Sequence, residues 1–519
     1  MKKVHLFLLV FCISVLNLYA QQKNATAVKY AETIKADDLK KHLYILAADS
    51  MEGRYTGKEG QKKAARYIEN HFKNIGLSAP VKINNQMQYQ QPYHLSNRSW
   101  GEVYIKGKNI TLNFQQNLFV IGDQNQNTAK EYELLYAGFG IDTTYYSDYK
   151  NIDPTGKALI CFAGEPSGKT AWAKHEYKWK YAKQKGATAL IIIGGNNDAE
   201  FADLMKYYAF YTKKETYNEL VNPNSGKENI YFVSMAAAAQ LLGISEAELL
   251  AQKNTIKNTN TSNVDAQKKH HPITLKSERI EKISTSAENV LGFLEGTDKK
   301  EEVLVITAHY DHIGKNSAGE VFNGADDDAS GTSCVLEIAE AFMQAAKEGY
   351  RPRRSILFMT VSGEELGLYG SEYYTDINPI FPLENTVANL NIDMVGRLGG
   401  DYETSNNPNY IYLIGSDKLS TDLHNISETA NSTYTQLKLD YKYNSDSDPN
   451  RFYNRSDHYN FAEKKIPIIF YFNGTHVDYH GANDTADKIH YPKMEKIAHL
   501  VFHTAWEIAN RDQRPVVNK

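Results

Sequence analysis

The sequence predicts an α/β fold in which a mixed, mostly parallel sheet is covered by helices on both faces. Apolar runs typical of buried strands lie at residues 303–306, 356–359, 387–392 and 466–472. Helical stretches such as 332–345 and 419–431 separate some of these runs, and strands that alternate with helices favour parallel pairing. At 519 residues the chain is too long for one typical core, so we expect two or three domains.

The first twenty residues are typical of a secretory signal peptide. Lys2 and Lys3 supply the positive start, residues 6–16 form the apolar stretch, and Ala20 ends a plausible cleavage site before Gln21. We therefore expect residues 1–20 to be removed and the protein to be exported, to the periplasm or the extracellular space. A retained membrane anchor is the alternative, although the apolar run is short for a span.

Composition excludes several classes of protein. The formal net charge is -4 and no stripe of Lys and Arg is evident, so a nucleic-acid partner is not expected. No segment beyond the signal is long and apolar enough to span a bilayer. The mature chain would keep only Cys161 and Cys334, both in apolar segments, and we expect buried free thiols. Nothing in the sequence indicates the oligomeric state.

Three blocks follow the signal. Residues 21–116 are expected to form an N-terminal part of the main domain, with two helices between about 37 and 77 and Gly76 ending the second. Residues 117–275 are expected to form a separate, smaller α/β unit, with a polar linker over 252–271. The strand and helix alternation described above occupies residues 276–519.

Metal-binding residue types follow several predicted strands at the point where each strand ends. His309 and Asp311 follow the first run, Glu364 and Glu365 the second, and Asp393 the third, while His480 follows the last after a loop. An acidic loop, 323–331, precedes a helix. Because ligands bind beyond the carboxyl ends of strands in such sheets, these side chains are expected to meet. Imidazole and carboxylate without Cys suit a catalytic zinc site.

Each of these signals is weak by itself, because a His near an Asp is more often a surface loop and an Asp run is more often a solvated turn. Their coincidence at successive strand ends favours the metal site. A second His pair, His499 and His503, has the spacing of a zinc motif on a helix. The residue after His499 is Leu500 and not the Glu that the motif requires, so we expect this pair to be packing or surface residues.

The motifs at these positions resemble one known family. They read Ala-His-Tyr-Asp-His-Ile-Gly, Gly-Ala-Asp-Asp-Asp-Ala-Ser-Gly, Gly-Glu-Glu-Leu-Gly-Leu-Tyr-Gly-Ser, Asn-Ile-Asp-Met-Val-Gly and Asp-Tyr-His. In this order they resemble the co-catalytic zinc aminopeptidases of metallopeptidase clan MH. Residues 42–77 resemble the start of that family, and the middle block resembles its inserted protease-associated domain. The resemblance implies a zinc exopeptidase fold.

The resemblance also implies a role for each motif residue around two zinc ions. Asp327 would bridge the two ions, His309 and Asp393 would complete one ligand set, and Glu365 and His480 would complete the other. Three further residues would bind no metal: Glu364 would be the general base, Asp311 the acid that orients His309, and Tyr479 a group that steadies the developing oxyanion. Ser456-Asp457-His458 resembles another family motif whose role the sequence does not fix.

By this resemblance the protein is an aminopeptidase that acts on peptides with a zinc-activated water. Carboxypeptidase and glutaminyl cyclase activities also occur in the clan and stay open. A binding protein that keeps the fold without catalysis is disfavoured, because every ligand type and the base are present. The preferred N-terminal residue cannot be deduced, since the loops that would build its pocket cannot be aligned.

Overall fold

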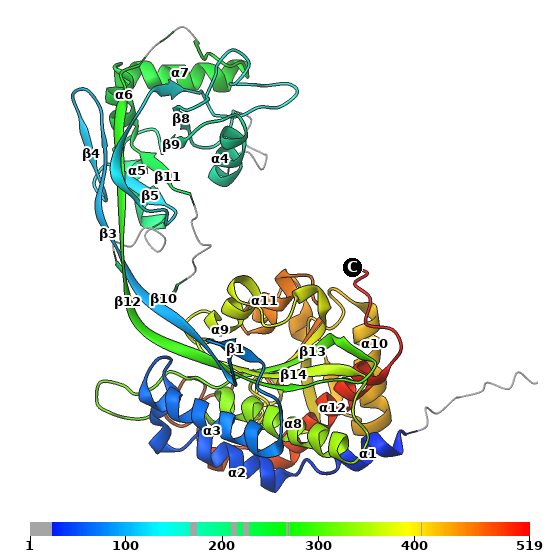
Figure 1. Ribbon diagram of the computed structural model, residues 1–519. Helices are drawn as coiled ribbons and strands as arrows, with labels where there is room; N and C mark the ends of the chain where they lie inside the picture. The colour runs from blue at the N-terminus through cyan, green and yellow to red at the C-terminus, as the bar shows by residue number, and fades with distance from the viewer. Residues whose placement is uncertain are drawn as a thin grey trace, which may run out of the picture. The chain divides into compact units, whose positions relative to one another are not determined.

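The computed structural model describes residues 23–166, 174–208, 215–221, 228–265, 268, 270–405 and 407–519. The predicted signal peptide, residues 1–20, lies outside these residues. The chain forms two compact units (Figure 1): unit 1 holds the described residues up to Tyr93 together with Ala287–Lys519, and unit 2 holds His94–Ser286. Two long strands, β3 (Gln90–Lys106) and β12 (Ile273–Leu294), contribute residues to both units.

Unit 2 begins earlier and ends later than the insert predicted at 117–275. The physical reason is that β3 and β12 run unbroken through both boundaries, so Pro92 and the polar residues 284–286 beside them lie inside strands and not in loops. That unit 2 is a protease-associated domain stays a prediction.

The sheet of unit 1 is mixed and mostly parallel, as predicted. Its strands run in the order β12, β14, β13, β15, β18, β16, β17. Parallel ladders join β13 to β14 and β15, β15 to β18, and β16 to β17, whereas β12 and β16 pair antiparallel with their neighbours β14 and β18. The bounds are β13 Lys299–His309, β14 Arg354–Val361, β15 Thr386–Ile392, β16 Tyr410–Ile414, β17 Lys438–Asp440 and β18 Ile468–Phe472.

Helices cover both faces of this sheet (Figure 1). One face packs against α8 (Gly331–Lys347), α12 (Tyr491–Asn510) and the N-terminal helices through a large apolar core. The other face packs against α11 (His458–Glu463) through a smaller core that contains Phe461. The remaining helices of unit 1 are α1 Ala25–Ala31, α2 Ala36–Leu46, α3 Glu59–Ile75, α9 Tyr369–Glu372 and α10 Thr421–Ala430, and a short hairpin joins β1 Val81–Ile83 to β2 Gln86–Gln88.

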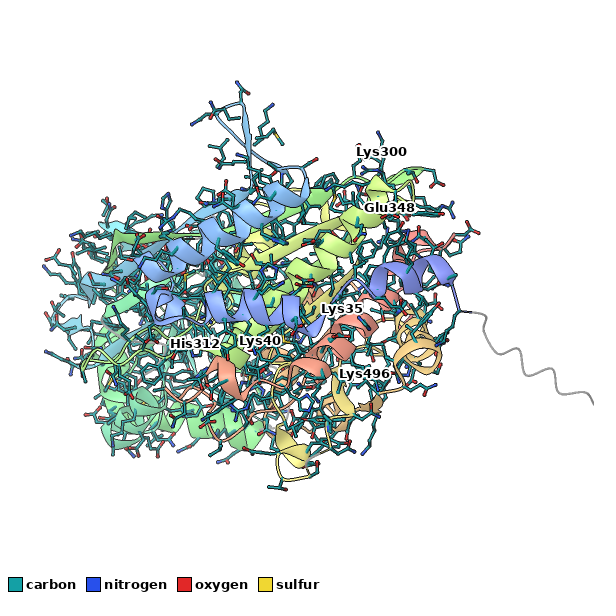
Figure 2. All side chains as sticks on the ribbon, turned by 90° about the horizontal axis from the view of Figure 1, so that it is seen from below. Lys35, Lys40, Lys300, His312, Glu348 and Lys496 are labelled. Atoms are coloured by element: carbon teal, nitrogen blue, oxygen red, sulfur yellow. The ribbon has the colours of Figure 1, made fainter. Side chains whose placement is uncertain are left out.

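The two predicted N-terminal helices are α2 and α3. Leu39, Leu43 and Leu46 of α2 are buried at helical spacing, while exposed Lys35 and Lys40 line its outer side (Figure 2). Gly76 ends α3 in the left-handed conformation, with φ of 96°, which only glycine adopts without strain. These helices complete the core of unit 1, so residues before the insert and after it fold together.

The pair His499 and His503 is confirmed as packing residues of α12. His499 Nε2 lies 3.0 Å from the carbonyl oxygen of Ile34, and the ring of His503 stacks on Tyr434 with centroids 3.7 Å apart. Cys161 and Cys334 are confirmed as buried free thiols. Among the helices that the structure describes, none is long and apolar enough to cross a membrane.

Unit 2 is a separate α/β unit with its own sheet. Its strands run in the order β5, β11, β9, β8, β7, with β5 antiparallel to β11 and the other pairs parallel. The bounds are β5 Leu118–Ile121, β7 Leu134–Tyr136, β8 Ala158–Phe162, β9 Ala189–Ile193, β11 Ile230–Val233, α4 His175–Gln184, α5 Asp198–Tyr207, α6 Met235–Leu242 and α7 Glu246–Thr259. Three further strands, β4 Thr111–Asn113, β6 Gln126–Tyr132 and β10 Glu215–Leu220, pair with β3 or β12.

The linker predicted over residues 252–271 is wrong in its first part, because α7 extends to Thr259. Its residues are polar, which suggested a loop, but Leu249, Lys253 and Ile256 form a buried face at helical spacing. Asn, Thr and Lys occupy the exposed faces of this helix, where their polarity carries no structural signal.

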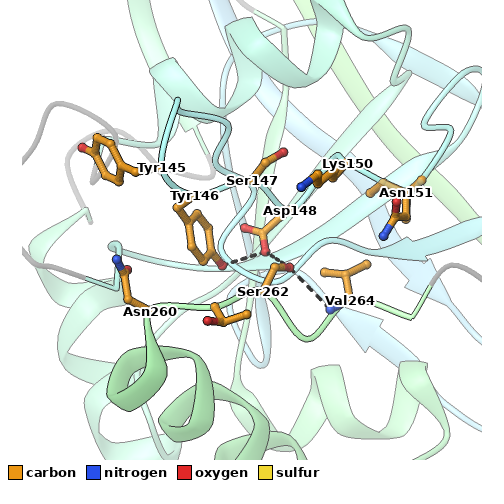
Figure 3. Close-up of a pocket in the computed structure, with 11 residues that line it drawn as sticks. Tyr145, Tyr146, Ser147, Asp148, Lys150, Asn151, Asn260, Ser262 and Val264 are labelled. Atoms are coloured by element: carbon orange, nitrogen blue, oxygen red, sulfur yellow. Dashed lines mark hydrogen bonds between the residues drawn. The ribbon is translucent and has the colours of Figure 1, made fainter.

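Unit 2 contains a polar pocket of about 250 Å³ between residues 145–152 and 260–264. Figure 3 shows Asp148 at its centre. The carboxylate of Asp148 accepts hydrogen bonds from the backbone N–H groups of Phe139 and Ile141 and from the hydroxyl groups of Tyr146 and Ser262. Asp148 therefore joins the two segments, and both of its oxygens are satisfied by the protein itself.

Candidate metal centre

The predicted ligands meet at the carboxyl edge of the unit 1 sheet. His309 is the last residue of β13, Asp393 directly follows β15, and Glu365 follows β14 after a short turn. His480 lies in the loop after β18. Asp327 comes from the loop that precedes α8, so five separate segments contribute one ligand each.

Asp327 stands between two imidazoles. Its Oδ1 lies 3.2 Å from His309 Nε2, and its Oδ2 lies 3.1 Å from His480 Nε2. The two oxygens of Asp327 therefore face two different groups of side chains, one around His309 and one around His480. This is the arrangement that a carboxylate bridging two cations requires.

The other ligands complete the two groups. His309 Nε2 is 3.6 Å from Asp393 Oδ1, and His480 Nε2 is 3.2 Å from Glu365 Oε2. Ligand atoms about 2.0–2.2 Å from one tetrahedral zinc ion lie about 3.3–3.6 Å apart. The observed separations of 3.1–3.6 Å lie in this range or at most about 0.2 Å below it, which suits one ion in each group.

The charges of the centre indicate that it requires cations. Burial lowers the pKa of His309, but the carboxylates of Glu364 and Asp393 outweigh burial and raise it well above its ordinary value. Burial likewise opposes a higher pKa at His480, yet Asp327 and Glu365 raise it to about 10. Positive charge is therefore strongly stabilised at both places where the ligands converge. The residues present fit two zinc ions by donor type, spacing and charge.

Glu364 lies close enough to His309 and Asp393 to form a metal-holding group with them, but the family resemblance assigns it the role of base. Its Oε2 is 3.9 Å from His309 Nε2, and it lines a pocket together with His309, Asp327 and Asp393. Burial raises the pKa of Glu364 well above its ordinary value, with Glu365 and Asp393 adding to this shift and His309 opposing it. A carboxylate whose pKa is raised is a stronger base and suits proton transfer.

Asp311 is buried next to His309, but the contact differs from the expected one. His309 Nδ1 lies 3.2 Å from the backbone oxygen of Asp311 and 3.7 Å from its carboxylate. The Asp311 carboxylate instead accepts hydrogen bonds from the Thr56 hydroxyl and the backbone N–H of Glu364. Asp311 therefore connects the ligand His309, the candidate base and the N-terminal segment.

Tyr479 lines the same pocket, as predicted from its place beside His480. Its ring stacks on His480 with centroids 3.9 Å apart, and its hydroxyl accepts a hydrogen bond from Arg455 at 3.1 Å. The rest of the pocket wall is formed by Arg455, by Thr475 and by four apolar side chains: Met394, Phe452, Phe470 and Phe472.

Sequence reasoning missed three residues that contact the ligands. His312 Nδ1 lies 2.8 Å from Glu365 Oε1. Asp484 accepts hydrogen bonds from the backbone N–H groups of Asp326 and Asp327 and so holds the bridging loop. The hydroxyl of Ser456 donates to Asp393 Oδ2 at 2.6 Å. His312 and Ser456 lie inside motifs noted in the sequence, whereas only the folded loop brings Asp484 to the site.

Comparison with known protein families matches residues 289–505 to Peptidase family M28. This range contains all five candidate ligands and Glu364. This part of the chain is similar to peptidase family M28. The family consists of peptide hydrolases, and the predicted resemblance to co-catalytic zinc aminopeptidases is thereby confirmed.

Individual relatives match over different lengths. Aminopeptidase YwaD of Bacillus subtilis (strain 168) is 22% identical over 489 residues, which cover 92% of this chain and 86% of YwaD. A probable zinc metalloprotease of Pyrenophora tritici-repentis (strain Pt-1C-BFP) is 37% identical over 123 residues, 22% of this chain and 23% of the relative. The chain thus aligns with about a quarter of the length of this relative.

Two solved structures match most of the chain at low sequence identity. The aminopeptidase from Aneurinibacillus sp. strain AM-1 is 20% identical with a TM-score of 0.46, covering 95% of this chain and 98% of the other. The zinc aminopeptidase BSAP from Bacillus subtilis is 20% identical with a TM-score of 0.47, covering 93% and 98%.

Proposed function

We propose that the protein is an exported zinc aminopeptidase that removes N-terminal residues from peptides and holds two zinc ions. The observation that carries this proposal is the position of Asp327, whose two oxygens each face a different imidazole and carboxylate group. His309 and Asp393 would complete one zinc site, and Glu365 and His480 the other. The match of residues 289–505 to Peptidase family M28 supports the reaction class.

Zinc at these positions would polarise the scissile carbonyl group and make water a better nucleophile near neutral pH. Glu364 accepts the proton of the attacking water and delivers it to the leaving amine. Its raised pKa favours the first step, because a carboxylate of higher pKa takes up a proton from water more readily.

The remaining site residues orient the reacting groups. Asp311 fixes the backbone at Glu364 and, through its own carbonyl oxygen, the ring of His309. Tyr479 presents its hydroxyl to the pocket and steadies the oxyanion that develops on the substrate carbonyl. The aromatic wall formed by Phe452, Phe470 and Phe472 excludes water from one side of the pocket.

Export of the protein is supported by the charged start, the short apolar run and Ala20. N-terminal sequencing of protein from its source should find Gln21 first. An intact Met1 in the purified protein would contradict this part of the proposal.

Unit 2 is proposed to be a protease-associated domain that shapes access of substrate, since none of the candidate ligands comes from it. Replacing residues 94–286 by a short linker should give a folded protein that keeps its zinc. A folded variant that has lost zinc would contradict this assignment.

The activity is tested with amino-acid p-nitroanilides and with a peptide in free and N-acetylated form. Cleavage of the free peptide should require zinc and should stop on acetylation, because an aminopeptidase binds the free amine next to acidic groups. Equal rates on free and blocked peptides would favour a carboxypeptidase or endopeptidase. Cyclisation of an N-terminal glutamine without peptide cleavage would identify a glutaminyl cyclase.

A further inference from the structure

One cation lines the catalytic pocket without a charged partner. Arg455 belongs to the same pocket wall as His309, Asp327 and Glu364. Its guanidinium lies over the ring of Phe452 at 5.1 Å from the centroid and donates to the neutral hydroxyl of Tyr479. Within the described part of the chain, no carboxylate forms an ion pair with it.

A second arginine near the site shows the contrast. Arg397 follows β15 and donates to Asp478 at 2.9 Å, with Asp484 also 3.9 Å away. Its charge is therefore balanced by the protein. Arg455 has no such balance and most of its N–H donors are free to bind a ligand.

The position of Arg455 is fixed relative to the metal centre. The next residue, Ser456, donates to the candidate ligand Asp393 and accepts a hydrogen bond from Asn391 at 2.8 Å. The stacking on Phe452 and the bond to Tyr479 restrict the side chain itself. A restricted guanidinium loses little conformational entropy when it binds, and its planar donors match a carboxylate.

We propose that Arg455 binds a carboxylate group of the peptide substrate, a proposal that rests on the aminopeptidase function above. The catalytic acids at the base of the pocket repel an anionic substrate, and Arg455 offsets this repulsion at the rim. In a dipeptide the C-terminal carboxylate lies only one residue beyond the scissile bond, about 3.3–3.6 Å of chain. An acidic side chain on the second residue offers the same chemical group.

Arg455 thereby makes the enzyme selective for substrates that carry a negative charge just beyond the cleaved bond. Short peptides with a free C-terminus are the first source of such a charge, and peptides with Asp or Glu in the second position are the other. Because Arg455 is exposed at the pocket rim, the selectivity should weaken as salt screens the interaction.

The test compares kcat/KM of the zinc-loaded full protein on two matched pairs of substrates. The first pair is Leu-Ala and Leu-Ala-amide, and the second is Leu-Glu-amide and Leu-Gln-amide. Arg455→Gln removes the charge at similar length, and Arg455→Lys keeps a charge without the planar donors. Arg451→Gln is the matched control, because Arg451 is exposed nearby but does not line the pocket.

The wild-type protein should prefer Leu-Ala over its amide by about tenfold, mainly through KM, as expected for one charge-assisted contact. Arg455→Gln should abolish the preference, so that the ratio of kcat/KM between Leu-Ala and its amide falls to about one. Arg455→Lys should keep part of it, and Arg451→Gln all of it. A preference confined to the Leu-Glu-amide pair would identify the side chain as the source of the carboxylate.

A preference that survives in Arg455→Gln would overturn the proposal. An equal loss on the acid and the amide would also overturn it, since Arg455 would then act through Tyr479 on every substrate. If the wild-type protein cleaves neither Leu-Ala nor its amide, the aminopeptidase function is wrong, and this inference is wrong with it.

Discussion

Two buried aspartates, Asp148 in unit 2 and Asp327 in unit 1, occupy opposite chemical environments. The oxygens of Asp148 receive backbone N–H groups and hydroxyl groups, so its charge is balanced by protein dipoles. The oxygens of Asp327 face imidazoles, and three further carboxylates crowd around it: Glu364, Glu365 and Asp393. Burial of an acid is common to both, so burial by itself does not identify a metal site.

The two aspartates differ in how many N–H and O–H hydrogen-bond donors surround each carboxylate. A buried carboxylate that has enough N–H and O–H donors stabilises the fold, as Asp148 does by joining two segments. A cluster of buried carboxylates that exceeds its donors is stable only if cations balance it. The following changes test this distinction.

The largest effect is expected for Glu364→Gln. The amide keeps the shape of the side chain but cannot accept the proton, so kcat should fall by about 10²- to 10⁴-fold. Zinc content, measured by metal analysis, should stay the same because Glu364 is not a proposed ligand. Glu301→Gln is the control, since Glu301 is exposed far along β13 from the site. Near-normal turnover of Glu364→Gln would mean that the base lies elsewhere.

A different result is expected for Glu365→Gln. The change removes an anionic ligand from one ion only, so affinity for one zinc should fall more than tenfold. Activity should recover in part when zinc is added, and titration with a zinc chelator should show two ions released in separate steps. If Glu365→Gln keeps both ions while Glu364→Gln loses one that added zinc restores, the two roles are reversed.

A smaller loss should follow Ser456→Ala. Ser456 touches no proposed ion but donates to the ligand Asp393, and the loss of such a supporting hydrogen bond weakens metal binding by about tenfold. Competition with a zinc chelator measures this change. The exposed Ser447→Ala should leave the affinity unaltered. Unchanged affinity in Ser456→Ala would remove Ser456 from the supporting network.

The smallest effect on catalysis is expected for Asp148→Asn. Its amide group cannot accept all the hydrogen bonds of the carboxylate, so unit 2 should lose about 1–3 kcal/mol of unfolding free energy, measured by denaturant titration. Zinc content and kcat should not change. Asp203→Asn, at an exposed position of α5, should leave stability within about 0.5 kcal/mol. Zinc loss in Asp148→Asn would break the distinction between the two aspartates.

Much of the fold of unit 1 could be predicted from the sequence, because its buried parallel strands are continuous apolar runs. The run at 303–306 became β13, and the run at 356–359 became β14, each extended by a few residues. The polar helix α7 was missed, because its Asn, Thr and Lys residues resemble a loop and its buried face is narrow. The boundaries of unit 2 were missed, since β3 and β12 run through them as unbroken strands.

For the site, the sequence by itself determined the chemistry: which residues end the strands, and that imidazoles and carboxylates are brought to one edge of the sheet. It did so because the side of the sheet at which parallel strands end is fixed by their direction. Only the tertiary structure decided how Asp327 divides its oxygens between His309 and His480. The reason is that distances between segments far apart in the sequence depend on how the loops pack. The same packing brings Asp484 to the loop of Asp327 and Ser456 to Asp393, and it leaves Arg455 without a charged partner among the residues that the structure describes.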